Sequence, residues 1–184
     1  LERRLVAWKA FEDLPFPSFQ YGLGIFGNGT SFQPEMIDPL SMEASVSIDA
    51  NDGVVALPFS EAMSKYGEII KDHFMTSCVL PDDKMTALHG ALFGHGVLVH
   101  APRGAQGSVR LRFSAGKTML SHVLVVAEEG SKITVVDERR SSRQDDHGYH
   151  SHVVEVVARD QAEILYVSLQ KLSQHMSTLE RKAA

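Results

Sequence analysis

A short apolar motif occurs three times in the second half of the chain. The segment GVLVHAPRG (96–104) is followed 26 positions later by HVLVVAEEG (122–130), and a looser copy, VVEVVARDQ (153–161), follows after another 31. Each later copy leads into a second apolar run, at 132–138 and 163–170. Recurrence of short strands with glycine and polar corners is typical of a solenoid, in which each coil packs only on its neighbours.

The strands themselves favour a parallel β-helix. They are rich in valine and almost continuously apolar, as strands buried on both faces tend to be. We interpret RRSSRQDDHG (139–148) as an excursion of about ten residues, which leaves about 21 residues for the coil, a length suited to one solenoid turn. An antiparallel sandwich also has many short strands, but it does not explain identical residues in register. The sequence predicts a mainly β fold, with residues 94–184 as the first coils of the helix.

The repeat also predicts which side chains share a face. Side chains alternate across a strand, so residues at equivalent positions of successive coils point the same way. One face should form a valine ladder, made of Val97, Val99, Val123, Val125, Val154 and Val156. Leu98, Leu124 and Glu155 should face the opposite side.

Residues 1–93 are expected to form a small α/β segment that covers the start of the solenoid. Apolar periodicity predicts helices, and a period of two around Asn-Asp-Gly predicts a hairpin. An irregular arm (21–40) contains Asn28-Gly29-Thr30, a glycosylation sequon that we interpret as a turn. The expected elements are helices over Glu2–Glu12, Ser60–Met75 and Lys84–Phe93, the last capped by Asp82 or Asp83, and a hairpin over Ser45–Pro58.

Composition narrows the classes of function. The chain has 184 residues, 43% of them hydrophobic, enough for one domain with a sizeable core. Its net charge of -5 gives no general attraction to nucleic acid or an acidic membrane. No stretch reaches the ~18 apolar residues of a membrane span, and no signal peptide is visible. The single cysteine, Cys78, excludes an internal disulfide framework and suits a reducing cytosol, so we expect a cytoplasmic protein.

Five segments lie in order along the chain: FEDLPFPSFQYGLGI, DGVVALPFSEAMSKYGEIIKDHF, DDKMTALHGALFGHGVLVHAPRG, HVLVVAEEGSKITVVDE and HSHVVEVVARDQAEILYVSLQ. Together they resemble the SufB/SufD family of iron–sulfur cluster assembly proteins. The resemblance implies a right-handed parallel β-helix and a non-catalytic scaffold role in the Suf machinery. It also implies pairing with a SufB/SufD-type subunit or with itself, binding of a SufC-type ATPase, and an iron–sulfur cluster held only transiently in the full assembly. It leaves flavin binding open.

Two departures from the family pattern matter. Family members are considerably longer, and their SufC-binding helices and cluster-assembly residues lie beyond the coils seen here. The chain, which starts at Leu1, is therefore interpreted as truncated, and no catalytic residue is assigned. Where SufB commonly has Glu-Gly-Cys after a strand, this chain has DERRSS (137–142), without a thiol. That difference favours a SufD-like or divergent member.

The best metal candidates lie in HGYHSHVVE (147–155). His150 and His152 face the same side of a strand, a spacing that suits two ligands of one metal. This pattern supports an alternative function, a cupin-like metalloenzyme using His150 and His152. Against it, Glu155 faces away from both histidines. Iron–sulfur clusters take several thiolates, so we interpret Cys78 as a small, semi-buried hydrophobic residue.

The remaining histidines show no catalytic pattern. His89, on an apolar helical segment, is expected to be structural and to bond to backbone at the entrance of the solenoid. His95, His100 and His122 lie on or beside strands without a nucleophile and acid at recognisable spacing.

The end of the solenoid predicts association. Nothing resembling a cap follows the strand at 163–170, so Ile164, Tyr166 and Leu169 should be exposed beside unpaired backbone. We therefore expect a homodimer, or association through the final strands.

Overall fold

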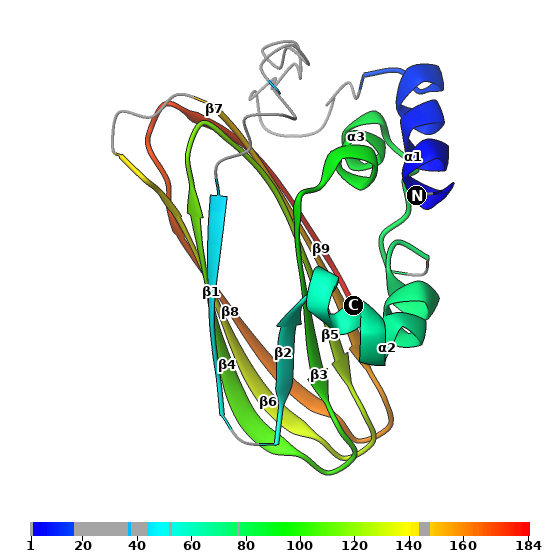
Figure 1. The fold of residues 1–184 in the computed structure, drawn as a ribbon, viewed down its shortest axis with the longest axis vertical. Coiled ribbons are helices and arrows are strands. Elements are labelled where there is room, and N and C mark those ends of the chain that lie inside the picture. The colour runs from blue at the N-terminus through cyan, green and yellow to red at the C-terminus, as the bar shows by residue number, and fades with distance from the viewer. Residues whose placement is uncertain (1, 17–36, 38–43, 52, 77, 144–147) are drawn as a thin grey trace, which may run out of the picture.

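The computed structural model describes residues 2–16, 37, 44–51, 53–76, 78–143 and 148–184 (Figure 1). The sequon and all of the expected arm except Ile37 lie outside these residues. Within them the chain forms three helices and nine strands in two sheets, ordered β1-β4-β6-β8 and β2-β3-β5-β7-β9. The strands are β1 (Ala44–Ala50), β2 (Val55–Pro58), β3 (His95–Ala101), β4 (Gln106–Ala115), β5 (Thr118–Ala127), β6 (Lys132–Ser141), β7 (Gly148–Ala158), β8 (Glu163–Lys171) and β9 (Met176–Ala183).

The repeated motifs stack as parallel coils. Strands β3, β5, β7 and β9 pair in parallel in one sheet, and β4, β6 and β8 in the other. Val97 lies beside Val123, which lies beside Val154, so the two offsets read from the sequence are the offsets between coils. The predicted mainly β solenoid with a small N-terminal α/β segment is confirmed.

The valine ladder is confirmed as the core between the two sheets. Val97, Val99, Val123, Val125 and Val154 are all fully buried there, with Val156 partly buried at the margin. The opposite face of the same strands carries Leu98 and Leu124 into a second core beneath the helices. One strand therefore supplies both cores, which explains why its sequence is apolar at consecutive positions.

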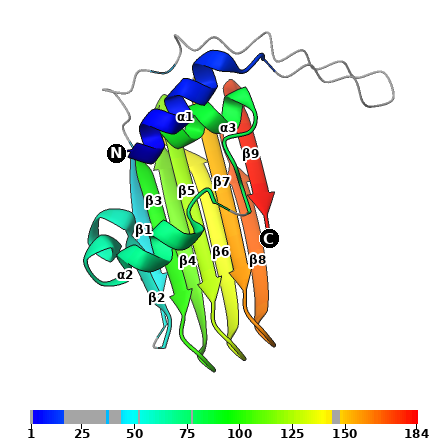
Figure 2. The same ribbon diagram turned by 90° about the vertical axis from the view of Figure 1, so that its right-hand side faces the viewer.

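Three helices cover the outer face of the five-stranded sheet (Figure 2). They are α1 (Glu2–Asp13), α2 (Phe59–His73) and α3 (Lys84–Leu92). Asp83 caps α3, because its carboxylate accepts hydrogen bonds from the backbone N–H groups of Met85 and Thr86. Helix α2 ends two residues earlier than expected, before Met75 takes a positive φ of 49°.

Two arginines of α1 tie the three helices together. Arg3 donates to the carbonyls of Lys71 and Phe74 at the end of α2. Arg4 donates to those of Ala91 and Phe93 at the end of α3. Both helix ends leave carbonyls without intrahelical partners and carry partial negative charge, so a guanidinium suits each of them.

The expected hairpin over Ser45–Pro58 is wrong. A turn does form at Asn51 and Gly53, where Gly53 has a φ of 91°. The two strands, however, do not pair with each other: β1 pairs antiparallel with β4, and β2 with β3, in different sheets. At the first coil each strand finds an open sheet edge, and those edges outcompete local pairing.

Two further expectations near the end of the chain are also corrected. Arg139 and Arg140 belong to β6 rather than to an excursion, and register shows that the corner before β7 is five residues longer than its counterpart before β5. The chain after Gln170 forms another strand, β9, parallel to β7. Among the described strands, β8 and β9 are therefore the edges at the C-terminal end of the solenoid, and β1 and β2 are the edges at the other end. The proposed division at residue 93 stays a prediction.

Candidate functional sites in two buried polar networks

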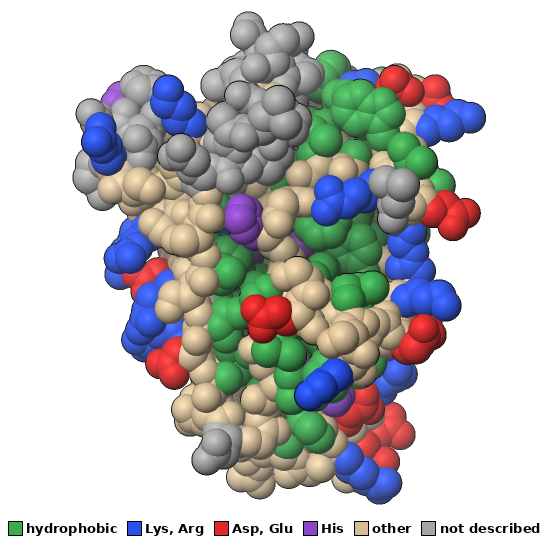
Figure 3. All heavy atoms as spheres, in the orientation of Figure 1, with side chains coloured by type: hydrophobic (Ala, Val, Ile, Leu, Met, Phe, Trp, Pro, Cys, Tyr) green, Lys and Arg blue, Asp and Glu red, His purple; other side chains and the backbone are tan. Residues whose placement is uncertain are grey.

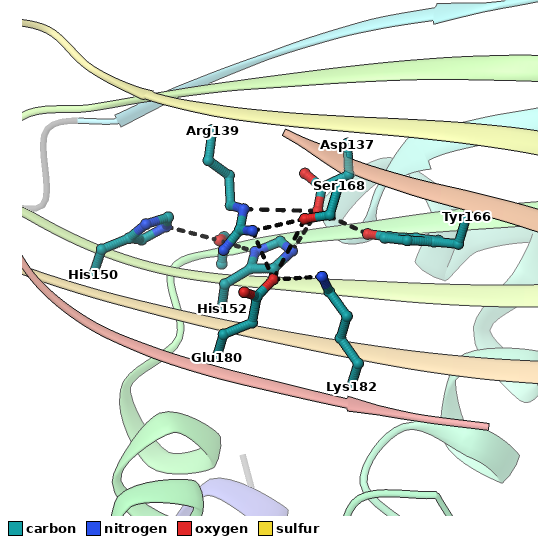
Figure 4. A network of polar contacts seen from close by, with 9 residues as sticks. Asp137, Arg139, His150, His152, Tyr166, Ser168, Glu180 and Lys182 are labelled. Atoms are coloured by element: carbon teal, nitrogen blue, oxygen red, sulfur yellow. Dashed lines mark hydrogen bonds and ion pairs between the residues drawn. The ribbon is translucent and has the colours of Figure 1, made fainter. Parts of the chain in front are cut away.

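The interior of the last coils holds a polar network where the core would otherwise be apolar (Figure 4). Its members come from five strands of both sheets, β5 to β9, and point into the space between them. We call it the inner network, and it consists of Ser121, Asp137, Arg139, His150, His152, Tyr166, Ser168, Glu180 and Lys182.

Asp137 is the centre of the inner network. Its Oδ2 accepts hydrogen bonds from His152 Nε2 and from the Tyr166 hydroxyl, each at 2.8 Å. Burial disfavours the charged carboxylate, but the His152 hydrogen bond and the nearby charge of Arg139 outweigh it, so the pKa of Asp137 lies below its usual value. His152 therefore carries its proton on Nε2, and its Nδ1 accepts from the Ser121 hydroxyl at 2.7 Å.

Arg139 connects this centre to the open end of the solenoid. Although only 1% exposed, its guanidinium donates to Glu180 Oε1 at 2.6 Å and to Ser168 Oγ at 2.8 Å. Glu180 is also 2.6 Å from Lys182 Nζ. Two carboxylates thus face two cations, and the buried charges are compensated within the network.

The two histidines predicted as metal ligands do share the inner face of β7. Their ring centroids are 6.0 Å apart, and Glu155 faces the opposite side, as expected. Both nitrogens of His152 are engaged in hydrogen bonds. In the described part of the chain, no three His, Cys, Asp or Glu side chains are grouped to hold a metal. Metal binding by His150 and His152 stays a prediction, and this arrangement offers it little support.

A second polar network lies on the other side of the five-stranded sheet, beneath the helices. We call it the outer network, and it links Ser151, His89, His122 and Glu155 in a line. Ser151 Oγ lies 2.8 Å from His89 Nδ1, His89 Nε2 lies 3.3 Å from His122 Nδ1, and His122 Nε2 lies 3.0 Å from Glu155 Oε1. All four residues are fully buried.

The proton positions in this line follow from Glu155. Its two oxygens accept the backbone N–H groups of Met75 and Val79, at 2.7 and 3.1 Å, so it acts as an acceptor throughout. His122 must then donate from Nε2 and accept at Nδ1, which orients His89 in turn. Burial lowers the pKa values of both histidines, so both are neutral. Glu155 thereby fastens the loop after α2 to the sheet.

The sequence identified some of these residues but not their partners. His89 is structural, as expected, but it bonds to side chains rather than to backbone. Cys78 is half-buried, with Sγ 3.7 Å from the Val156 carbonyl. The sequence reasoning missed the role of Glu155. Its position inside a valine-rich strand was the available signal, because a carboxylate buried there needs partners.

Comparison with known proteins shows which family the chain resembles. The SufBD core domain of the SUF system for FeS cluster assembly matches residues 110–184. The iron–sulfur cluster assembly protein SufD of Bacillus subtilis is 26% identical over 95% of this chain. These matches support a member of the SufB/SufD family. A SufBD family protein of Synechocystis is 29% identical over 66% of the chain, and one of Pyrococcus horikoshii is 23% identical over 70%.

The SufB/SufD relatives are longer than this chain. The matched region covers 49% of the Bacillus protein, 26% of the Synechocystis protein and 30% of the Pyrococcus protein. The described helices include none that is long and apolar enough to cross a membrane.

Proposed function

We propose that this chain is a non-catalytic scaffold component of iron–sulfur cluster assembly. The observation that carries the proposal is the burial of its reactive side chains. His89, His122, Asp137, His152 and Glu155 are all fully buried and hydrogen-bonded to one another or to backbone. Groups placed in this way hold coils together and do not reach a substrate, which suits a rigid support rather than an active site.

The scaffold is proposed to be SufD-like. At DERRSS, where SufB commonly has a cysteine, β6 continues and turns Asp137, Arg139 and Ser141 inward. The relative named SufD also matches nearly the whole chain. The residues of this segment therefore suit a strand with a structural role.

The proposed partners are those that family membership suggests. We propose a SufB/SufD-type subunit and a SufC-type ATPase as partners of the full-length protein, in the cytoplasm. An iron–sulfur cluster would be cargo of the assembly rather than a resident cofactor. ATP hydrolysis would belong to the SufC-type subunit.

Co-purification tests this proposal. The full-length protein is mixed with a SufB-type and a SufC-type subunit, and complex formation, cluster formation from iron and sulfide, and ATP hydrolysis are measured with and without it. We expect a complex, more cluster in its presence, and no ATP hydrolysis by the chain alone. ATPase activity of the chain alone, or the lack of any complex, would contradict the scaffold proposal.

Self-association is proposed to use the open edge of β8. The strand is self-complementary about Val167: antiparallel pairing with a second copy places Glu163 opposite Lys171 and Leu165 opposite Leu169. The two leucines are 59% and 39% exposed on the outer face. Cross-strand pairs of opposite charge and of apolar residues both stabilise a sheet, and an unpaired edge invites such pairing.

A charge swap tests this pairing. Sedimentation at low micromolar concentration should show a dimer for the natural sequence. Glu163→Lys and Lys171→Glu should each weaken it by placing like charges opposite each other, and the double variant should restore it. A monomeric natural sequence, or a double variant no better than the singles, would exclude this register.

A cupin-like metalloenzyme is not favoured by any observation. Cupins are antiparallel jelly rolls, whereas the strands around His150 and His152 are parallel. Metal analysis of the purified protein still separates the two functions. Stoichiometric metal that disappears in the His150→Ala, His152→Ala variant would overturn the scaffold proposal.

A further inference from the structure

The outer face of the four-stranded sheet is not covered by the described helices. All three helices lie over the five-stranded sheet, on the other side of the solenoid (Figures 1 and 2). Lys and Arg side chains, with Asp and Glu side chains among them, project along the left margin of the molecule in Figure 3, where the four-stranded sheet faces outward.

Strand register defines the residues of this surface, which we call the basic face. On it, Arg112 of β4 lies beside Glu138 of β6, which lies beside Leu169 of β8, and Arg140 lies beside Lys171. Neighbouring strands are about 4.8 Å apart, so these side chains are in reach of one another. The basic face consists of Arg110, Arg112, Glu138, Arg140, Leu169 and Lys171, with Asp49 of β1 beside Arg110.

The carboxylates on this face do not balance its cations. Lys171 Nζ lies 2.9 Å from Glu138 Oε1, and this hydrogen bond, with the charges of Arg112 and Arg140, lowers the pKa of Glu138. Arg140 and Lys171 are direct neighbours on adjacent strands, a like-charge arrangement that destabilises a sheet. An added carboxylate would relieve this repulsion.

The chemistry of the face favours a protein partner over a nucleic acid. Leu165 and Leu169 are 59% and 39% exposed beside the cations, and a phosphate backbone has no apolar group to cover them. We propose that the basic face docks an acidic protein segment that carries apolar side chains among its carboxylates.

A binding measurement with charge variants tests the docking surface. The probe is a fluorescent peptide of Glu-Glu-Leu repeats, and its anisotropy is followed against the whole chain at low ionic strength. Arg112→Glu with Arg140→Glu should weaken binding about tenfold or more, because attraction becomes repulsion. Arg112→Gln with Arg140→Gln should give a smaller loss. The matched control, Lys9→Glu with Lys65→Glu, reverses two exposed lysines of the helix layer and should change the affinity less than about twofold.

Two further measurements distinguish the kind of partner. Leu169→Ser should weaken binding of the peptide several-fold. Leu5→Ser, the same substitution at an exposed leucine of α1, should not weaken it. An oligothymidylate of the same charge should bind more weakly than the peptide. Equal affinity of the peptide for the basic-face variants and the control variants, or tighter binding of the oligothymidylate, would overturn the proposal. Each variant is first shown to unfold at the temperature of the natural sequence, within a few degrees. These assays use no Suf component, so they leave the scaffold proposal untouched.

Discussion

Truncation of Glu155 should be one of the most damaging single changes in the protein. Its carboxylate is fully buried and accepts three hydrogen bonds, from Met75 N, Val79 N and His122 Nε2. Glu155→Ala leaves those three donors buried without partners, and an unsatisfied buried donor costs about 1–3 kcal/mol. We therefore expect a loss of at least about 3 kcal/mol in the free energy of unfolding.

Equilibrium unfolding in urea, followed by circular dichroism, measures this loss. Glu155→Gln keeps the size of the side chain but presents an amide N–H to a donor, so its loss should be smaller and still above about 1 kcal/mol. Glu129→Gln is the control, because that carboxylate is exposed and its ion pair with Arg103 is worth less than about 1 kcal/mol. A Glu155→Ala protein within about 1 kcal/mol of the natural sequence would refute the outer network as a fastening of the loop.

Three further changes test the fold and its pH dependence. Burial lowers the pKa of His150 to about 3, so only the unfolded chain takes up a proton at this histidine as the pH falls below 6.5. The free energy of unfolding should therefore decrease below pH 6.5 by up to about 1.4 kcal/mol per pH unit. In urea unfolding at pH 7, 6 and 5, His150→Met should make that decrease shallower, and an unchanged slope would contradict the role of His150. Gly148→Ala would place a Cβ 1.6 Å from the Lys117 carbonyl oxygen and should lower the melting temperature strongly, whereas Gly67→Ala, which meets only ordinary contacts, should not. Val125→Ala should cost about 1–3 kcal/mol in urea unfolding, and a loss near zero would mean that the valine ladder is not interior.

The coil repeat was readable because its interior is apolar. Identical valines at Val97, Val123 and Val154 fixed the register of three coils, and the structure has that register. Strand β9 was missed for the opposite reason, since its inward side chains are Thr178, Glu180 and Lys182, and a polar strand has no periodic apolar signal. The failed hairpin shows that turn residues fix where the chain reverses and not which edge a strand joins.

The buried networks were only partly within reach of the sequence. Aligning the repeats places His152 beside Ser121, a contact that the structure contains. Contacts such as Glu155 with Met75 join residues far apart in sequence through helix packing, which no coil offset encodes. Such contacts depend on where the helices settle on the sheet.

The two arginines of α1 have a consequence for synthesis of the chain. Their carbonyl partners follow them by 68 to 89 residues, so α1 leaves the ribosome well before the ends of α2 and α3 exist. At common elongation rates that interval lasts roughly 3 to 18 s. During it the apolar side chains of α1 have no native partner, and a nascent chain stalled before Phe93 should present this segment to chaperones.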